Sequence, residues 1–213
     1  MEIPVKVLCV FAHPDDEVLF GFPVLQEKSL DRHLIILTSG HERHGDKPIK
    51  ALKEICSNEG INFYEVAGLS NQFYRLPYRY DDFVLSNAAK MVNDIVDKAI
   101  AEIRPDFIMT HNPMGEYGHG DHKLCFELIA TNPNVKNLII TDTALKDIHI
   151  SYDKVPKVYQ QNYYRKENYY MTSQIDMDFF NRCLEVYKKH GVWTGRQDTP
   201  YITKANLYHL LKD

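Results

Sequence analysis

Short apolar runs alternate with segments of helical periodicity along the first two thirds of the chain, and this alternation is the strongest constraint on its fold. Five runs read as buried strands: residues 5–11, 33–37, 63–66, 107–110 and 138–140. Helical segments fall between them: residues 17–28, 49–58, 86–103 and 122–130. Continuous apolar strands are typical of a sheet covered on both faces. Strands that alternate with helices predict an α/β fold with a Rossmann-like, mostly parallel sheet and flanking helices.

The last third of the chain differs in composition. Tyrosines crowd residues 152–170, which predicts extended segments packed on the domain. A helix is expected to follow over about residues 174–189. Ser173 and Asp176 resemble a capping arrangement at the start of that helix, and Gly191 lies where the helix would end.

The size and composition of the chain favour one globular domain. With 213 residues, 44% of them hydrophobic and 25% charged, the chain can bury a full-sized core. It contains no linker, internal repeat or low-complexity tract. We therefore expect a single domain over residues 1–213, with a sheet core at about 1–145 and a tyrosine-rich C-terminal extension at about 146–213.

Charge and cysteine content restrict the partners and the compartment. A formal net charge of −4 provides no basic surface for nucleic acid or anionic lipid, so neither nucleic acid nor a membrane is an expected partner. No apolar run is long enough to cross a bilayer. We expect a cytoplasmic protein, for which homo-oligomerisation remains open. The cysteines lie singly, without CxxC spacing, and read as buried free thiols: Cys9, Cys56, Cys125 and Cys183.

Polar loops follow three of the predicted strands. His13 comes directly after the first strand, residues 38–44 follow the second, and residues 111–122 follow the fourth. Ligands of open α/β sheets bind beyond the carboxyl ends of the strands. The three loops are therefore expected to converge on one edge of the sheet and to form a site there.

Two of these loops carry the residue types of a catalytic zinc site. They read Ala-His-Pro-Asp-Asp-Glu over residues 12–17 and Gly-His-Gly-Asp-His over residues 118–122. An acidic helix start and two surface histidines are the plain alternative, but a histidine before the acidic pair and dense ionisable groups between glycines favour a site. Catalytic zinc takes three protein ligands and keeps one position for water. Asp15 is a natural base for that water, and three other residues supply the ligands: His13, Asp16 and His122.

The paired motifs resemble those of the LmbE-like, or PIG-L-like, family of zinc-dependent N-deacetylases, and the resemblance covers about the first two thirds of the chain. Members of that family deacetylate N-acetylglucosamine units attached to inositol, malate, phosphatidylinositol or aminoglycosides. Carried onto this sequence, the resemblance implies zinc bound by His13, Asp16 and His122. It also implies that Asp15 is the general base.

The same resemblance implies roles for three further residues. His119 would be the charged group beside the developing oxyanion and a proton source for the leaving amine. Tyr117 would help to polarise the amide carbonyl, and Asp121 would orient a histidine. The expected reaction is hydrolysis of the N-acetyl amide of an N-acetylglucosamine-type sugar or its conjugate, giving acetate and a free amine. Iron(II) is an alternative to zinc, because nitrogen and oxygen ligands discriminate weakly among such metals.

Other functions stay open beside this one. An amidase of a thiol or sugar conjugate would use the same metal chemistry. A non-catalytic sugar- or nucleotide-binding protein is less favoured, because no Gly-x-Gly-x-x-Gly sequence follows the first strand. The expected partner is a small amino-sugar substrate. Four polar residues are candidate substrate contacts, with a solvated surface position as the alternative for each: Arg43, His44, Asn71 and Arg75.

Overall fold

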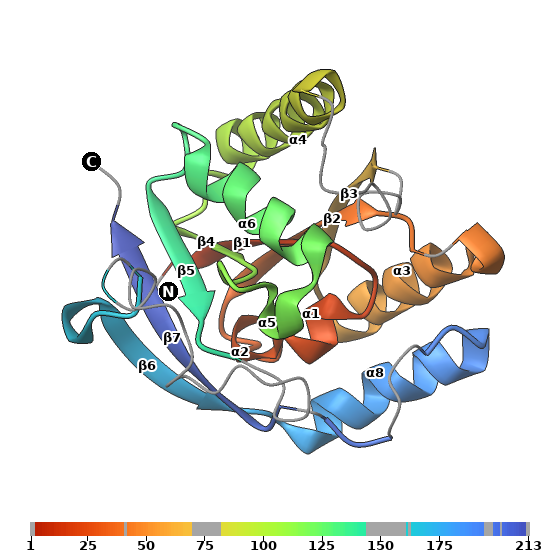
Figure 1. Ribbon diagram of the computed structural model, residues 1–213. Coiled ribbons are helices and arrows are strands. Elements are labelled where there is room, and N and C mark those ends of the chain that lie inside the picture. The colour runs from red at the N-terminus through yellow and green to blue at the C-terminus, as the bar shows by residue number, and fades with distance from the viewer. Residues whose placement is uncertain are drawn as a thin grey trace.

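A seven-stranded sheet forms the centre of the protein (Figure 1). The computed structural model describes residues 3–40, 42–69, 82–143, 161, 163–193, 198–200 and 202–211. Its strands are β1 (Lys6–Phe11), β2 (Asp31–Thr38), β3 (Asn62–Leu69), β4 (Phe107–Thr110), β5 (Asn137–Thr141), β6 (Tyr169–Gln174) and β7 (Lys204–Leu211). The order across the sheet is β3-β2-β1-β4-β5-β7-β6, and the pairs from β3 to β5 are parallel. The predicted mostly parallel α/β sheet is therefore confirmed.

Helices cover both faces of the sheet (Figure 1). One face packs against α1 (Asp16–Leu19), α2 (Phe22–Leu25), α3 (Lys47–Glu59) and α8 (Met177–His190). The other packs against α4 (Asp82–Ile103) and α6 (Gly120–Thr131). Along β1, Val7, Cys9 and Phe11 belong to the first core, whereas Leu8 and Val10 belong to the second. Because both faces are buried, the strand reads as a continuous apolar run rather than an alternating one.

The segment predicted as one helix over residues 17–28 forms two short helices, α1 and α2, so that prediction is wrong in its extent. Gly21 lies between them, where an added β-carbon would come within 2.7 Å of both the Phe11 ring and the Glu17 carbonyl oxygen. Close packing on β1 requires a glycine at this point, and glycine disfavours a continuous helix. Pro23, near the start of α2, also lacks the N–H that would bond back to α1.

The C-terminal part adds two antiparallel strands to the sheet, because β7 pairs with β5 and β6 pairs with β7. Helix α8 begins after Asp176, whose side chain accepts a hydrogen bond of 2.9 Å from the Asp178 N–H. The predicted cap at Ser173 is wrong, because Ser173 lies within β6. The predicted helix end is confirmed, since Gly191 follows α8 with φ 68°. Much of the tyrosine-rich stretch, residues 151–160, lies outside the described residues.

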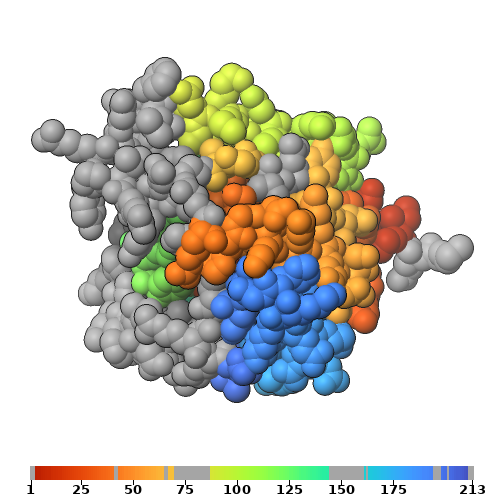
Figure 2. Space-filling model, turned by 90° about the vertical axis from the view of Figure 1, so that its right-hand side faces the viewer, coloured from red at the N-terminus to blue at the C-terminus, as the bar shows by residue number. Residues whose placement is uncertain are grey.

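Helix α8 lies beside α3 on the face that Figure 2 shows. Arg182 donates two hydrogen bonds to the buried carboxylate of Glu59, at 2.6 and 2.9 Å. Phe180 and Tyr187 of α8 are fully buried and share one hydrophobic core with β1 and α1. The C-terminal helix is therefore built into the same core as the strand that precedes the first motif.

The cysteines are buried and free, as predicted, and none of the helices described is both long and apolar enough to cross a membrane. Burial raises the pKa of each of the four thiols above its ordinary value: Cys9, Cys56, Cys125 and Cys183. Each thiol stays in its protonated, unreactive form at neutral pH.

Candidate metal and catalytic site

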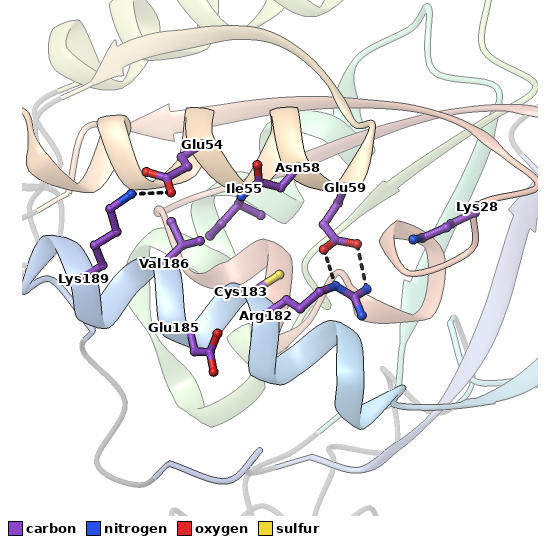
Figure 3. Close-up of a pocket in the computed structure, with 10 residues that line it drawn as sticks. All are labelled: Lys28, Glu54, Ile55, Asn58, Glu59, Arg182, Cys183, Glu185, Val186 and Lys189. Atoms are coloured by element: carbon purple, nitrogen blue, oxygen red, sulfur yellow. Dashed lines mark hydrogen bonds and ion pairs between the residues drawn. The ribbon is translucent and has the colours of Figure 1, made fainter.

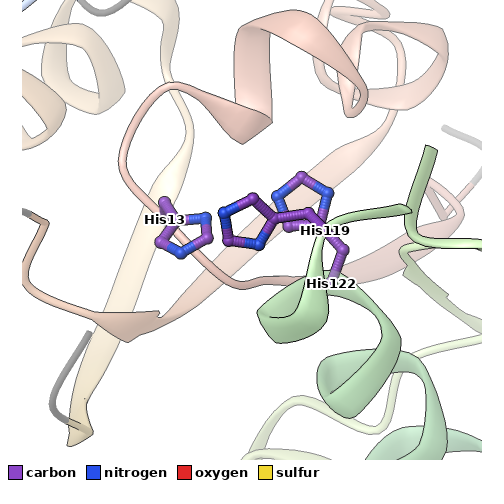
Figure 4. A group of neighbouring side chains, drawn as sticks. All are labelled: His13, His119 and His122. Carbon is purple, nitrogen blue, oxygen red and sulfur yellow. The ribbon is translucent and has the colours of Figure 1, made fainter. Parts of the chain in front are cut away.

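The two predicted motifs meet at the carboxyl ends of β1 and β4, which are neighbours in the sheet. His13 lies just beyond β1, while His119 caps the start of α6 and His122 lies in its first turn. The three rings lie together although they come from two distant loops (Figure 4). The ring centroids of His13 and His119 are 4.8 Å apart, and those of His119 and His122 are 4.6 Å apart.

The loop after β2 also reaches this edge of the sheet. Gly40 has φ 86°, and an added β-carbon there would contact Pro48 and Pro14. The predicted convergence of the three loops is thus confirmed. Arg43 and His44 lie in a short 3₁₀ helix, η1 (Glu42–His44), where the Arg43 Nε donates to the His44 Nε2 at 2.9 Å.

Asp16 lies at the centre of the site, where its carboxylate contacts three histidine rings. Its carboxylate is almost fully buried and lies 3.2 Å from the His13 Nδ1 and 3.3 Å from the His122 Nε2. It also accepts a hydrogen bond of 2.7 Å from the His13 N–H, and its Oδ2 lies 3.2 Å from the His111 Nε2. Burial alone would raise the pKa of Asp16, but the charges of His122 and His111 outweigh burial and hold that pKa well below its ordinary value.

Sequence reasoning did not single out His111 and Glu116, which lie at the base of the site. Glu116 belongs to the irregular turn α5 (Gly115–Gly118) and has φ 56°. Its Oε2 accepts hydrogen bonds from the His122 Nδ1 at 2.7 Å and from the His111 Nδ1 at 3.0 Å. Burial opposes the charged carboxylate, but the two histidines lower the pKa of Glu116 to about 2. Glu116 therefore stays ionised and fixes both rings.

The hydrogen bonds decide which ring nitrogens are available to a metal. Because Glu116 accepts a hydrogen bond from the His122 Nδ1, a neutral His122 has its lone pair on Nε2, and this buried atom has no hydrogen-bond partner among the described residues. The His13 Nε2 donates to the Asp121 Oδ2 at 2.9 Å, which leaves the His13 Nδ1 lone pair facing Asp16. Two lone pairs and a carboxylate in one buried space require a cation or added protons among them.

The other two histidines, His111 and His119, each use a ring lone pair to accept a hydrogen bond. The His111 Nε2 accepts a hydrogen bond from the Ala12 N–H at 3.0 Å, so its lone pair is already used. The His119 Nδ1 accepts from the Asp121 N–H at 3.2 Å, so a neutral His119 carries its hydrogen on Nε2. Two sets have ligand atoms within 4.8 Å of one another: His13, His119 and His122, and Asp16, His111 and His122. The hydrogen bonds of His111 and His119 favour a single ligand set that combines members of the two groups: His13, Asp16 and His122.

The pKa values in this cluster follow from burial and from the neighbouring charges. Burial disfavours the imidazolium of His13, but Asp121 and Asp16 raise its pKa to about 10. For His122, burial is likewise outweighed by Asp16 and Glu116, and the pKa rises to about 9. In His119, burial and the charges of His122 and His13 lower the pKa to about 4. The lowered pKa favours the neutral form of His119 near pH 7.

Asp15 and Tyr117 complete the predicted catalytic residues. Asp15 is only 6% exposed and has φ 103°, a backbone conformation that side-chain-bearing residues rarely adopt. Burial and the negative charges of Asp16 and Asp15 raise the pKa of Tyr117, so its hydroxyl keeps its proton. Tyr117 therefore remains a hydrogen-bond donor near Asp15.

Two predicted substrate contacts lie outside the described residues: Asn71 and Arg75.

The two site residues that the sequence interpretation missed, His111 and Glu116, differ in whether the sequence carries a signal for them. His111 follows β4 directly, much as His13 follows β1, and this position is a usable signal. Glu116 carries no such signal, since only the fold shows that two histidines share its carboxylate.

A groove lies elsewhere on the molecule, between α3 and α8 (Figure 3). It has a volume of about 570 Å³, and Glu59, Arg182 and Cys183 are among its lining residues. None of the lining residues belongs to the histidine cluster. Its charged groups include the Arg182–Glu59 and Lys189–Glu54 pairs, so this groove provides no catalytic constellation.

The fold and the site together define a class, an α/β protein with a buried cluster of histidines and carboxylates of the kind that binds metals. A family model described as PIG-L, GlcNAc-PI de-N-acetylase, matches residues 8–132, which include β1, α6 and both motifs. The chain belongs to this family of deacetylases, which are hydrolases.

Individual relatives are distant. A protein of Acanthamoeba polyphaga mimivirus, named uncharacterized protein L374, is 27% identical over 173 residues, covering 76% of this chain and 74% of the relative. A 1D-myo-inositol 2-acetamido-2-deoxy-alpha-D-glucopyranoside deacetylase of Segniliparus rotundus is 27% identical over 147 residues, covering 55% of this chain and 46% of the relative. The chain thus spans about half the length of that curated relative.

Solved structures agree on the fold. The crystal structure of a deacetylase in complex with teicoplanin, from the teicoplanin biosynthesis pathway, superposes with a TM-score of 0.65 at 12% identity. The match covers 98% of this chain and 100% of that chain. At this identity the likeness is one of fold, and it extends over the C-terminal strands and α8 as well as the sheet core.

Proposed function

We propose that the protein hydrolyses the N-acetyl amide of an N-acetylglucosamine-type sugar or its conjugate, giving acetate and a free amine. The observation that carries this proposal is a buried set of converging donor atoms: the His13 Nδ1, the Asp16 carboxylate and the His122 Nε2. Family membership supports the same reaction class. The curated relative from Segniliparus rotundus bears the name of such a deacetylase.

A divalent metal fits this donor set. His13, Asp16 and His122 would hold it, and two nitrogens with one carboxylate suit zinc first and iron(II) second. When bound, the metal supplies a Lewis acid that polarises the amide carbonyl and lowers the pKa of water. Asp121 and Glu116 would keep the two histidines in the tautomers that expose the required lone pairs.

The remaining residues move protons and donate hydrogen bonds. The Asp15 carboxylate would accept the proton of the attacking water, because Asp15 directly precedes Asp16 in the chain and is shielded from solvent. The His119 Nε2–H and the Tyr117 hydroxyl would donate hydrogen bonds to the oxygen that gains charge. Because the pKa of His119 is about 4, we assign it this donor role. The proton held by Asp15 then passes to the leaving amine.

The test is release of primary amine from N-acetylglucosamine and its simple glycosides by zinc-loaded protein. Asp15→Asn should abolish release while leaving bound zinc unchanged, because Asp15 is not in the ligand set. Asp94→Asn is the matched control, since Asp94 is an exposed residue of α4 paired with Lys90. Release by wild type and Asp94→Asn alone supports the proposal. Release from a thiol conjugate but from no sugar would instead favour the amidase alternative.

A further inference from the structure

The backbone of Asp15 is held in an unusual conformation by a side chain rather than by regular secondary structure. Asp15 has φ 103° and ψ −23°, and its N–H donates a hydrogen bond of 2.9 Å to the Glu17 Oε2. Non-glycine residues at positive φ persist only where the surroundings enforce them. The Glu17 carboxylate is therefore part of what fixes the direction of the Asp15 side chain.

Glu17 is in turn held by a residue from the far end of the chain. It is fully buried, and its Oε1 accepts a hydrogen bond of 2.6 Å from the Tyr187 hydroxyl, 170 positions later in the sequence. Tyr187 is 1% exposed and lies in α8. One carboxylate oxygen thus binds the Asp15 backbone, and the other binds the C-terminal helix.

A purely packing role explains this arrangement poorly. A carboxylate costs free energy when it is buried, and an apolar side chain would fill the space between α1 and α8 without that cost. The two hydrogen bonds of Glu17 instead form a continuous link from α8 to the backbone of Asp15. Catalytic groups need such support, because a displacement of about 1 Å can cost about 100-fold in rate.

We propose that Tyr187 and Glu17 are positioning residues for Asp15, so that helix α8 is part of the catalytic machinery although it lies outside residues 8–132. This inference rests on the proposed function, in which Asp15 takes a proton from water. In it, Glu17 acts as a hydrogen-bond acceptor and does not exchange a proton with the substrate.

The first experiment removes the Tyr187 hydroxyl and keeps its ring. Tyr187→Phe should lower kcat at least tenfold, with KM and zinc affinity within twofold of wild type. The matched control is Tyr164→Phe, because Tyr164 is also buried and its hydroxyl donates to the Thr141 carbonyl, away from Asp15. An equal kcat loss in both variants, or none in Tyr187→Phe, would overturn the proposal.

The second experiment separates acceptance of a hydrogen bond from proton transfer at Glu17. Glu17→Gln keeps an acceptor for the Asp15 N–H and should retain at least tenfold more kcat than Glu17→Met, which has none. Adding Tyr187→Phe to Glu17→Met should cause little further loss, since both changes break the same link. If Glu17→Gln were as inactive as Glu17→Met, Glu17 would be acting through its proton, contrary to the proposal.

Amide hydrogen exchange tests the link without any assay of activity. Tyr187→Phe should speed exchange in a peptide covering residues 14–19 and leave a peptide covering β4 unchanged. Unchanged exchange over residues 14–19 would overturn the positioning role even if no substrate were found. Wild-type protein that releases no amine, yet shows the exchange effect, would refute the proposed function and leave the structural link supported.

Discussion

The replacement Glu116→Gln tests whether one buried carboxylate sets the tautomers of the site. The Glu116 Oε2 accepts a proton from each of two imidazoles, at 2.7 Å from His122 and 3.0 Å from His111. A glutamine of the same shape has one accepting oxygen, and its NH₂ group can only donate. If that oxygen takes the place of Oε2, the NH₂ group faces the Asn112 N–H, which in wild type donates to Oε1 at 3.1 Å. If the amide turns over, the NH₂ group faces both imidazoles, and each must lose its acceptor or move its proton to Nε2.

A proton on the His122 Nε2 would occupy the lone pair that the metal needs. Loss of a hydrogen-bond partner of a metal-binding histidine costs roughly 10–100-fold in metal affinity. At 1.36 kcal/mol per factor of ten, this corresponds to about 1.4–2.7 kcal/mol. The metal-free protein should lose roughly 1.5–3 kcal/mol of unfolding free energy, the usual range for a hydrogen bond to a charged group.

Competition with a chromogenic chelator measures the zinc affinity, and urea denaturation of the metal-free protein measures the stability. Glu127→Gln is the matched control, because Glu127 is an exposed residue of α6 and undergoes the same chemical change. The control should leave both quantities unchanged. Zinc affinity of Glu116→Gln within twofold of wild type would refute the tautomer argument and with it the choice of His122 as a ligand.

Three further predictions concern α8 and the thiols. Phe180→Ala should lower the free energy of unfolding by about 3–5 kcal/mol in urea, because Phe180 is fully buried in the core that α8 shares with β1; a loss below about 1 kcal/mol would contradict this packing. The hydrogen bonds from Arg182 lower the pKa of Glu59, so their stabilisation is present above the unfolded-state pKa of about 4.5 and is lost as the pH falls through the lower folded-state pKa. The stability gap between wild type and Arg182→Met should therefore shrink in acid, and a gap independent of pH would refute the pairing. A disulfide reagent should label the buried thiols far more slowly in native protein than in urea: Cys9, Cys56, Cys125 and Cys183. Rapid labelling of any of them in native protein would contradict their burial.

The sequence predicted most of the sheet because its signal is local. A parallel strand covered on both faces must be continuously apolar, and the five predicted runs became β1 to β5. Places where a local pattern competed with packing were predicted less well. Residues 17–28 read as one helix, but the Phe11 ring requires Gly21 beside it. Ser173 read as a helix cap, but pairing with β7 draws it into β6.

The site likewise contains residues that the sequence predicted and contacts that it could not predict. The sequence could propose His13, Asp16 and His122 as candidate ligands because both motifs lie in segments that follow strands, at the edge where an open α/β sheet binds its ligands. The sequence alone does not reveal that Glu116 sets the tautomer of His122, or that Tyr187 reaches Glu17. These contacts join residues from different loops and helices, and a linear pattern carries no information on their distance or on hydrogen-bond direction. The amino-acid sequence thus determined the sheet and the candidate ligands, whereas the tertiary structure decided which lone pairs remain free and which residues hold Asp15 in place.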